Sequence, residues 1–347
     1  MEILTKVGLH AINYDLPEER IALYPAEPRD SCRLLVVGLP SLNIIDTSFS
    51  DIGRFLRKGD IIVVNNSRVI NARIKGIKST GGVVEFLLLE KNEGIWKALG
   101  RPATRLKKGM NITIHHSEAG ITHVRIVDKN KGGVFLIEAP EDILKYGTIP
   151  LPPYIVKRRP VDKRDEEQYQ TVFSKTEGAV ASPTSVLHFT DKLVSELKAK
   201  GISIASVTLH VGPGTFKPLN KKPDEERYYI DKDEAARINA SRKICVCGTT
   251  AMRALETVYL KGNINPGKGK TGLIITPGYV FQVPDMFITN FHLPGTSLLS
   301  MVAAYLEQYF PGGGVDKLLF LYHHAIRNRY RFYSYGDAMI LLNDENI

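Results

Sequence analysis

The feature that most constrains the fold is a run of strand-like segments from Ile61 to Glu138, which no helix-period segment interrupts. Turns at Gly82, Gly94 and Gly133 separate the segments, and glycine turns of this kind join antiparallel strands as hairpins. The run predicts a small antiparallel β-barrel or sandwich over residues 61–149. The expected strands are Ile61–Val64, Val69–Ile77, Val83–Leu89, Ile95–Leu99, Asn111–His115, Ile121–Val127 and Val134–Ile137.

Three prolines within four residues, Pro150, Pro152 and Pro153, follow the strand run. Proline has no backbone N–H to donate to a helix interior or to an inner strand. We therefore expect neither element at this place, and we interpret the stretch as the hinge that leads out of the β region.

Strands and helices alternate from about Gly178 onward. This rhythm predicts an α/β fold with a mainly parallel sheet and flanking helices. Thr190 is an expected helix N-cap, as is either Thr249 or Thr250. The expected helices are Asp191–Lys200, Asp233–Ser241, Ala251–Lys261 and Ser297–Gln308, and the expected strands are Ile202–Val211, Lys243–Cys247 and Leu273–Ile275.

Three histidines, His188, His210 and His292, lie in short motifs beside turn signals. Ligands of α/β sheets bind beyond the carboxyl ends of the strands, so we expect these motifs on one rim. The turns Gly248-Thr249-Thr250 and Pro277-Gly278-Tyr279 are expected there too. Histidine has the side-chain pKa nearest neutrality, which suits proton transfer. Any one of the three is compatible with a core position, but three at element edges favour a lined pocket.

Several motifs leave alternatives open. Gly212-Pro213-Gly214 is compatible with a phosphate loop, but it lacks the third glycine and the helix start, which favours a tight turn. Gly248-Thr249-Thr250 opens a helix, where free N–H groups bind a carboxylate or phosphate, or where threonine caps the helix. Three histidines are compatible with a zinc site, although without the tight spacing that such sites often show. A Ser-His-Asp hydrolase lacks its Gly-x-Ser-x-Gly turn.

The chain is basic, with 46 Lys and Arg against 37 Asp and Glu in 347 residues, a formal net charge of +9. This excess predicts an anionic partner such as a nucleic acid, or it describes a basic protein and no more. Basic residues interleaved with aromatic ones suit phosphate contact and base stacking, whereas a solvated charged face explains any single cluster. The clusters are Arg68 and Arg73, Arg101 to Lys108, Lys157 to Arg164, and Arg327 to Arg331.

The chain has only three cysteines, Cys32, Cys245 and Cys247. A low and odd number of cysteines does not form a disulfide framework. Such usage fits a reducing cytosol. Cys245 and Cys247 are expected at alternate positions of a buried strand rather than in a metal site. We expect a cytoplasmic protein, because the first residues show no signal-peptide pattern and no apolar run is long enough to span a bilayer.

Motifs spread in order over most of the chain resemble the S-adenosylmethionine:tRNA ribosyltransferase-isomerases of queuosine biosynthesis. Together they are far more specific than any single motif. They are Tyr14-Asp15-Leu16-Pro17, Pro28-Arg29-Asp30-Ser31, Asn65–Arg73, Arg101-Pro102-Ala103, Leu151–Ile155, Tyr169–Phe173, Gly178–Thr190, Val207–Phe216, Gly248-Thr249-Thr250, Pro277-Gly278-Tyr279, Thr289–Pro294 and Tyr330–Ala338.

The resemblance implies two substrates: S-adenosylmethionine, used as a ribosyl donor, and a tRNA whose wobble base is 7-aminomethyl-7-deazaguanine. The product would be the epoxyqueuosine base, with adenine and methionine released. The resemblance also implies a discontinuous α/β catalytic domain, residues 1–60 and 150–347, with a β-barrel domain inserted at 61–149. It implies a cytoplasmic enzyme without a cofactor beyond its co-substrate, without a metal and without a membrane partner, and we expect a monomer.

This chemistry needs a base beside the sulfonium carbon and a proton donor for the departing adenine. His188, His210 and His292 are the candidates for proton transfer, because neutral imidazole exchanges protons at working pH. Asp337 is a candidate carboxylate partner, and Arg253 is a candidate for holding the methionine carboxylate. The other expected substrate-binding residues are Arg68, Arg73, Arg101, Thr184, Gly212, Gly214, Thr215, Thr249, Thr250, Tyr279 and Asn290.

The chain departs from the family pattern at three places. Asn65-Asn66-Ser67-Arg68 stands where Asn-Asp-Thr-Arg is usual, and Ala181–Val186 and Asp224–Tyr229 also differ. Two other functions remain as alternatives: a non-catalytic RNA-binding protein on the same scaffold, and a hydrolase with a histidine-bound metal. Retention of the three histidines favours catalysis, because phosphate binding needs only Lys and Arg.

Overall fold

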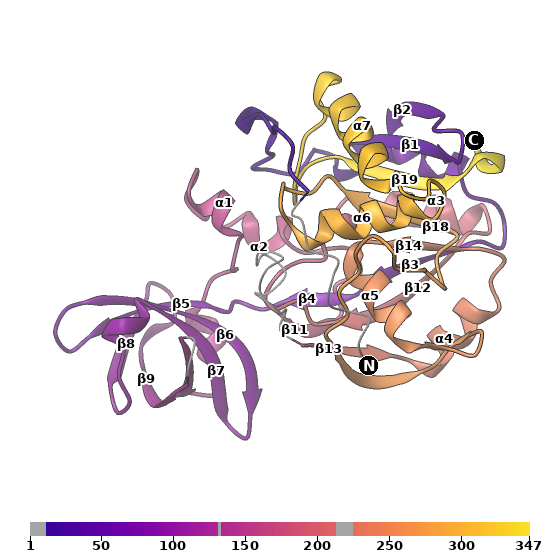
Figure 1. Ribbon diagram of the computed structural model, residues 1–347. Helices are drawn as coiled ribbons and strands as arrows, with labels where there is room; N and C mark the ends of the chain where they lie inside the picture. Colours follow the sequence, from indigo (N-terminus) through magenta and orange to yellow (C-terminus); the bar gives the residue numbers. More distant parts are fainter. Residues whose placement is uncertain (1–11, 131–132, 213–224) are drawn as a thin grey trace. The chain divides into compact units, whose positions relative to one another are not determined.

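The structure, a computed structural model, describes residues 12–130, 133–212 and 225–347 (Figure 1). The chain forms two compact units. The first, here called the α/β unit, contains the residues up to 66 together with 171–173 and 183–347. The second, the barrel unit, contains 67–170 and 174–182.

The α/β unit is built on a nine-stranded sheet that is mixed rather than mainly parallel, so this part of the expected fold is wrong. Four neighbouring pairs are parallel, β12/β3, β3/β14, β14/β18 and β1/β19, and the other four are antiparallel. In order across the sheet the strands are β17 (Gly267–Thr271), β13 (Glu226–Ile230), β12 (Ser203–Leu209), β3 (Ile61–Asn65), β14 (Ile244–Cys247), β18 (Met286–Asn290), β19 (Ala338–Asn343), β1 (Arg33–Leu39) and β2 (Ile44–Ser48).

An additional helix explains part of the mixed topology. Between β18 and β19 the chain forms two helices, α6 (Ser297–Glu307) and α7 (Gly314–Arg327), which pack against each other. A single crossover helix gives a parallel neighbour, but two successive helices return the chain to the edge where β18 ends. Asn290, the last residue of β18, therefore pairs with Ala338, the first of β19. Only α6 was expected from the sequence.

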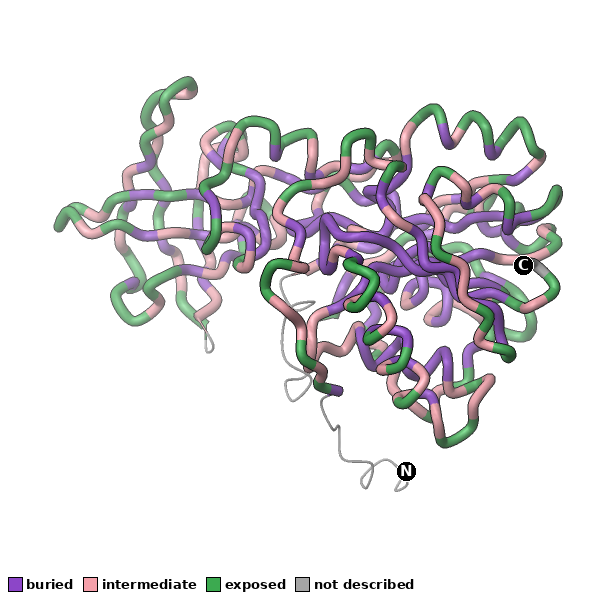
Figure 2. The backbone as a smooth tube through the Cα atoms, turned by 90° about the horizontal axis from the view of Figure 1, so that it is seen from above, coloured by how far each residue is buried: buried purple, intermediate pink, exposed green. Residues whose placement is uncertain are grey.

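Helices cover both faces of this sheet, whose strands are largely buried (Figure 2). Leu193 and Leu197 of α3 (Asp191–Ala199) belong to one core cluster with alternate residues of the central strands, such as Ile62. On β18, Phe287 alternates with these positions and packs against Tyr305 of α6, with ring centroids 5.5 Å apart. The remaining helices are α4 (Lys232–Asn239) and α5 (Thr249–Val258), with a small hairpin of β15 (Tyr259–Leu260) and β16 (Asn263–Ile264).

The helix caps confirm one expectation and correct another. Thr190 caps α3, since its hydroxyl accepts the N–H of Leu193 at 3.1 Å. Helix α5 is capped by Gly248 rather than by Thr249 or Thr250, and no side chain caps it.

Three strand predictions also need correction. Val69–Ile77 is not one strand, because Val69 ends β4 (Ser67–Val69), which lies outside the barrel, and β5 (Arg73–Lys78) begins after a break. The segment from Ile61 lies in the α/β sheet and not in the barrel; all five residues of β3 are buried, as is typical of an inner parallel strand. Leu273–Ile275 is not a strand, and the neighbouring strand is β17. β13, which the sequence analysis did not predict, pairs with both β12 and β17.

The barrel unit contains a closed six-stranded antiparallel barrel, which confirms the barrel and excludes the sandwich. Alternate residues such as Phe86 and Phe135 are fully buried inside it, the inside–outside alternation that a barrel requires. In order around the barrel the strands are β10 (Val134–Glu138), β7 (Ile95–Arg101), β6 (Val83–Asn92), β5 (Arg73–Lys78), β8 (Asn111–His116) and β9 (Gly120–Lys129).

Outside the barrel, this unit holds the parallel pair β4 (Ser67–Val69) and β11 (Thr176–Ala179) and two short helices. One of them, α1 (Pro153–Val156), forms within the proline-rich stretch, where no helix was expected. Pro153 is its first residue, a position where the missing N–H costs nothing. The second is α2 (Asp165–Gln168). Within residues 12–130, 133–212 and 225–347, 3-10 helices lie at Glu18–Arg20, Arg29–Ser31, Phe49–Arg54, Ala103–Arg105, Ile143–Tyr146, Thr184–Val186 and Asp344–Asn346.

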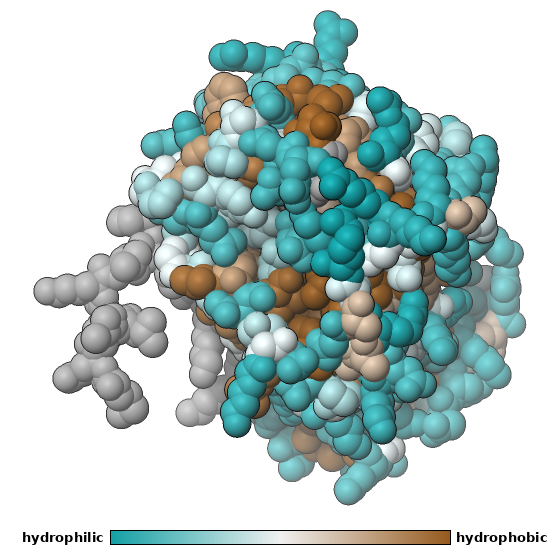
Figure 3. Space-filling model, turned by 90° about the vertical axis from the view of Figure 1, so that its right-hand side faces the viewer, coloured by the Kyte–Doolittle hydropathy of each residue, from teal (hydrophilic) through white to brown (hydrophobic). Residues whose placement is uncertain are grey.

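The surface view in Figure 3 is mostly hydrophilic, with apolar side chains visible in patches between polar ones. Among the residues that the structure describes, no helix is both long and apolar enough to cross a membrane.

Candidate active site

Four adjacent parallel strands of the α/β unit, β12, β3, β14 and β18, end at the same edge of the sheet. The chain continues from their last residues into His210, Asn66, Gly248 and Phe291. In sheets of this kind ligands bind beyond the carboxyl ends of the strands. The edge therefore brings His210, the Gly248 turn and the Asn290–His292 motif together, and we treat it as the candidate site.

Asn65, the last residue of β3, connects three of the segments at this edge. Its side-chain amide donates to Leu209 O (2.9 Å) and Thr250 Oγ1 (3.2 Å), and its Oδ1 accepts Leu209 N–H at 3.0 Å. Asn65 is fully buried, and a buried amide held on both its donor and its acceptor side fixes the elements it joins. It thereby positions the start of α5 beside the end of β12.

Asn66 replaces a carboxylate of the family pattern and lies in a separate polar network. Its Nδ2 donates to Ser206 Oγ at 3.1 Å, and its Oδ1 accepts the hydroxyl of Thr208 at 2.7 Å. Ser206 in turn donates to Glu234 Oε1 at 3.1 Å. An aspartate could not make the donation to Ser206, so the amide suits a network that already contains one carboxylate.

Gly248 permits the tight turn between β14 and α5. Its φ of +90° lies in the region that favours glycine. A Cβ at this position would lie 3.3 Å from Ser185 Cβ, next to the 3-10 helix that begins at Thr184. Thr249 and Thr250 are both buried in the first turn of α5, where backbone N–H groups lack partners within the helix. The turn thus keeps the start of α5, with its free N–H groups, close to Ser185.

His188 lies in a buried chain of hydrogen bonds. Burial raises the pKa of the Cys32 thiol, which keeps it protonated, and its sulfur lies 3.2 Å from His188 Nδ1. On the other side, His188 Nε2 lies 3.4 Å from Asn290 Oδ1, while Asn290 Nδ2 donates to Tyr333 O at 3.0 Å. This network assigns the tautomer: Nδ1 accepts the thiol proton and Nε2–H donates to Asn290.

His292 is equally buried. Its Nε2 lies 2.8 Å from Thr289 Oγ1. Its backbone N–H donates to the hydroxyl of Tyr322 at 3.0 Å, and its carbonyl accepts the hydroxyl of Tyr14. Burial lowers the pKa of His292 to about 3 and that of His188 to about 4, so both imidazoles are neutral at working pH.

His210 differs from the other two histidines in its exposure. It is half-buried and lies directly after β12, and its backbone N–H donates to Arg227 O at 2.9 Å. His188 and His292, by contrast, are 4% and 5% exposed. His210 is therefore the most accessible of the three to a ligand at the carboxyl edge.

The candidate methionine-carboxylate ligand Arg253 already has a carboxylate neighbour. It forms a largely buried ion pair with Glu226, and its Nε donates to Leu273 O at 2.8 Å. Glu226 Oε1 also accepts the N–H of Gly212 at 2.8 Å. Arg253 thus connects α5 to the turn after β12. Gly214 and Thr215, also expected to bind substrate, lie outside the described residues.

Two other predicted site residues, Asp337 and Tyr279, are held by protein partners. Asp337 accepts the N–H groups of Arg33 (3.0 Å) and Arg331 (2.7 Å), and so links the start of β1 to the segment before β19. The hydroxyl of Tyr279 donates to Glu256 of α5 at 2.8 Å. Thr184 is half-buried at the start of its 3-10 helix.

The expected arginine ligands Arg68, Arg73 and Arg101 all belong to the barrel unit. Arg73 pairs with Glu85 at 3.0 Å and donates to Leu151 O at 2.9 Å. Arg68 lies 3.9 Å from Glu177. Arg101 is exposed and lines a shallow, open hollow on the barrel.

Sequence analysis missed Cys32 and Glu226 as neighbours of the site. In the sequence, Cys32 stands out only as one of an odd number of cysteines, and Glu226 only as part of a segment that departs from the family. Nothing local in the sequence indicates contacts with His188 or Arg253, which lie 156 and 27 positions away. Among the described residues, no group of three or more His, Cys, Asp or Glu is arranged to hold a metal ion.

The two buried histidines predict how stability depends on pH. In the unfolded chain a histidine has a pKa near 6.5, so as the pH falls from about 6.5 to 4 the unfolded state binds protons that folded His188 and His292 do not. The free energy of unfolding should therefore fall across this window, by several kcal/mol. Urea unfolding at a series of pH values measures the fall, and it should be shallower for the His292→Gln variant. Parallel profiles for the variant and the wild type would contradict the prediction.

Comparison with known proteins gives the family. Residues 9–341 match the family model described as queuosine biosynthesis protein. The chain is 44% identical to the S-adenosylmethionine:tRNA ribosyltransferase-isomerase of Syntrophomonas wolfei, over 95% of this chain and 96% of that protein. It is 41% identical to the enzyme of the same name from Thermosipho africanus, over 96% and 99%.

A solved structure agrees. The crystal structure of S-adenosylmethionine tRNA ribosyltransferase from Thermotoga maritima is similar with a TM-score of 0.55 and 31% identity, covering 95% of this chain and 99% of that one. These matches run through both units and through the strands that form the carboxyl edge. The chain belongs to the queuosine biosynthesis family of S-adenosylmethionine:tRNA ribosyltransferase-isomerases.

Proposed function

We propose that this protein transfers the ribosyl moiety of S-adenosylmethionine to the 7-aminomethyl-7-deazaguanine wobble base of a tRNA and isomerises it. The product is the epoxyqueuosine base, and adenine and methionine are released. The observation that carries the proposal is the full-length similarity to enzymes of this name at 40–44% identity. The same observation favours this function over a non-catalytic RNA-binding protein and over a metal-dependent hydrolase.

The carboxyl edge of β12, β3, β14 and β18 is the proposed place of reaction. S-adenosylmethionine carries a carboxylate, and the first turn of α5 at Gly248-Thr249-Thr250 offers backbone N–H groups to an anion. Asn65 holds this turn beside the end of β12. The co-substrate then lies between the start of α5 and His210.

We assign proton transfer to His210. A general base works best when its pKa lies near the working pH, whereas burial lowers the pKa of His188 and His292 far below it. Those two histidines act as positioning residues: His188 orients Asn290, and His292 fixes the turn after β18 through Thr289 and Tyr322. Asp337 and Arg253 are likewise positioning residues. Asp337 acts by accepting backbone N–H groups, and Arg253 acts by pairing with Glu226, rather than on the substrate.

The substrate assignment is tested by incubating the protein with S-adenosylmethionine and a tRNA that carries the aminomethyl precursor. We expect adenine release that depends on both substrates and is absent with unmodified tRNA. A family member of known activity, assayed in parallel, serves as the control. If that enzyme releases adenine and this protein does not, the proposed function is wrong.

We further propose that the enzyme works in the cytoplasm as a monomer, with S-adenosylmethionine as co-substrate and without another cofactor. Its tRNA substrate and its three cysteines, all of them free, support a reducing compartment. Light scattering of the purified protein measures the oligomeric state directly.

A further inference from the structure

The positive charge of the chain is concentrated in the barrel unit. This unit carries 20 Lys and Arg against 13 Asp and Glu, a net charge of +7, whereas the α/β unit carries 26 against 24, a net charge of +2. The unit that holds less than half of the chain thus has most of the +9 excess. Such a concentration raises the local potential and attracts a polyanion to this unit in particular.

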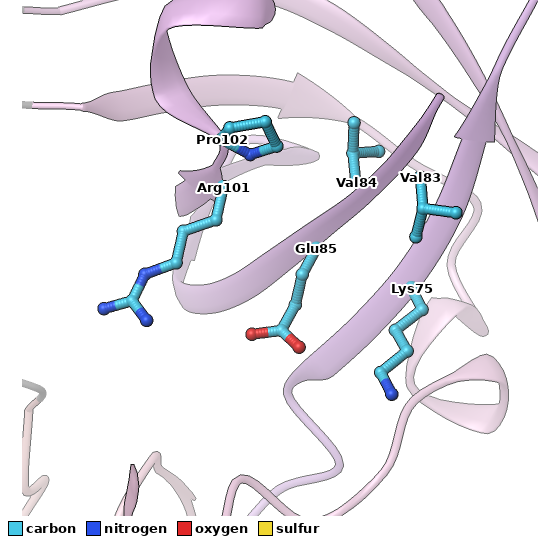
Figure 4. A pocket seen from close by; sticks show the side chains of 6 residues that line it. All are labelled: Lys75, Val83, Val84, Glu85, Arg101 and Pro102. Atoms are coloured by element: carbon cyan, nitrogen blue, oxygen red, sulfur yellow. The ribbon is translucent and has the colours of Figure 1, made fainter. Parts of the chain in front are cut away.

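Three charged residues form a row across neighbouring strands of the barrel. Lys75 of β5 pairs in register with Glu85 of β6, and Glu85 pairs in register with Arg101 of β7. Their neighbours along each strand, such as Ile74, Val84 and Gly100, are buried, so the row lies on the outer face of the barrel. Figure 4 shows the three side chains extending to the same side of the strands.

The two cations of this row are available to a ligand, whereas the carboxylate is not. Glu85 is engaged by Arg73 at 3.0 Å, an ion pair whose side chains are 17% and 28% exposed. Lys75 and Arg101 are exposed, and neither forms an ion pair within the part of the chain that the structure describes. Two strand spacings, roughly 10 Å, separate their backbones, so both side chains can reach one stretch of a phosphodiester backbone.

The row lines a shallow, open hollow of about 580 Å³, which also includes Val83, Val84 and Pro102. Val83 is 68% exposed, and its register partner Ile77 on β5 is 40% exposed. Exposed aliphatic side chains beside unpaired cations suit a nucleotide, which has apolar ribose and base surfaces next to its phosphate. A small inorganic anion would leave these apolar side chains without a contact.

We propose that the outer face of β5, β6 and β7 binds the phosphodiester backbone of the tRNA substrate, through Lys75 and Arg101, with Val83 in contact with the adjoining nucleotide. Arg73 keeps Glu85 from repelling the phosphate and does not itself bind it. This inference rests on the proposed function for the identity of the RNA, although the face would bind RNA whether or not the protein is catalytically active.

The test compares charge reversals on opposite sides of the barrel. Lys75→Glu/Arg101→Glu alters the proposed face. Arg125→Glu is a single-reversal control, to be compared with Lys75→Glu and Arg101→Glu made singly, because Arg125 is exposed on β9, three strands from β6 in either direction around the barrel. Fluorescence anisotropy gives the Kd of each variant for tRNA at several salt concentrations. Fluorescence of Trp96, the only tryptophan, which is buried in the barrel, verifies folding.

We expect the double variant to bind tRNA at least ten times more weakly than wild type, and Arg125→Glu to bind within about threefold. Each lost phosphate contact should reduce the slope of log Kd against log salt by about 0.7–0.9. At saturating tRNA the rate of adenine release should match that of wild type, so the loss appears in KM.

Three results would overturn the inference: a Kd for the double variant equal to that of wild type, equal losses in the double variant and in Arg125→Glu, or competition by polyglutamate as effective as that by tRNA of the same charge. The last result would indicate an acidic protein partner instead. Failure of wild type to release adenine, with tRNA binding lost only in the double variant, would refute the proposed function and leave the binding face intact.

Discussion

His210→Ala is expected to reduce the rate of adenine release about 10²–10⁴-fold, the usual contribution of a positioned acid or base. The loss should appear in kcat at saturating tRNA and S-adenosylmethionine, because the imidazole acts on the reacting atoms rather than on binding. His210 is the histidine to test first, since it alone of the three is only half-buried at the carboxyl edge.

Three further variants make this measurement specific. His210→Gln keeps much of the side-chain volume and should be as inactive as His210→Ala. His115→Ala removes an exposed histidine from the barrel strand β8 and should leave turnover unchanged. His292→Gln should lower stability more than it lowers kcat, because the buried imidazole of His292 contacts the hydroxyl of Thr289 rather than substrate. Turnover of His210→Ala within threefold of wild type would contradict the assignment of proton transfer to His210. His188 and His292 would then be the candidates for proton transfer.

Asp165→Ala is expected to lower the free energy of unfolding of the barrel unit by about 3–5 kcal/mol, the cost of leaving one charge of a buried pair alone. Asp165 is fully buried and Arg159 is 8% exposed. The pair is bidentate, with N–O distances of 2.8 and 2.6 Å, and Asp165 also accepts the N–H of Asp162 at 2.8 Å. Removal of the carboxylate takes both bidentate bonds to Asp165 away from a buried guanidinium.

Trp96 makes the measurement local, because the only tryptophan of the chain is packed in the barrel core. Urea unfolding followed by its fluorescence reports on the barrel unit, and circular dichroism reports on the whole chain. Glu166→Ala, which removes the neighbouring exposed carboxylate, is the matched control and should unfold close to wild type. Equal midpoints for Asp165→Ala and Glu166→Ala would mean that the buried pair adds nothing to stability.

The barrel was the most predictable part of the fold. Its strands are joined by short glycine turns, and their alternation of buried and exposed residues is local in sequence. The boundary of the strand run was less predictable. The five apolar or amide residues of β3 are compatible with a barrel strand, and only their pairing with β12 and β14 shows that they form an inner strand of the other sheet.

The candidate site was predicted in its elements but not in its contacts. His210, the Gly248 turn and the Asn290–His292 motif each follow a strand in the sequence, and the parallel order of these strands brings them to one edge. The three histidines were expected to be equivalent, and their difference in burial was not predictable in this way. Burial separates them, and it depends on residues as distant as Cys32 and Tyr322.

The sequence alone determined that this chain has a β-rich segment beside an α/β segment, a basic surface and the motifs of its family, because each of these depends on residue types and short spacings. Tertiary structure alone decided the mixed sheet, the paired state of Arg253 and Asp337, and the exposed pair of Lys75 and Arg101. These depend on which strands become neighbours. Strand order, and the partners that satisfy each buried charge, arise from contacts between residues far apart in the chain.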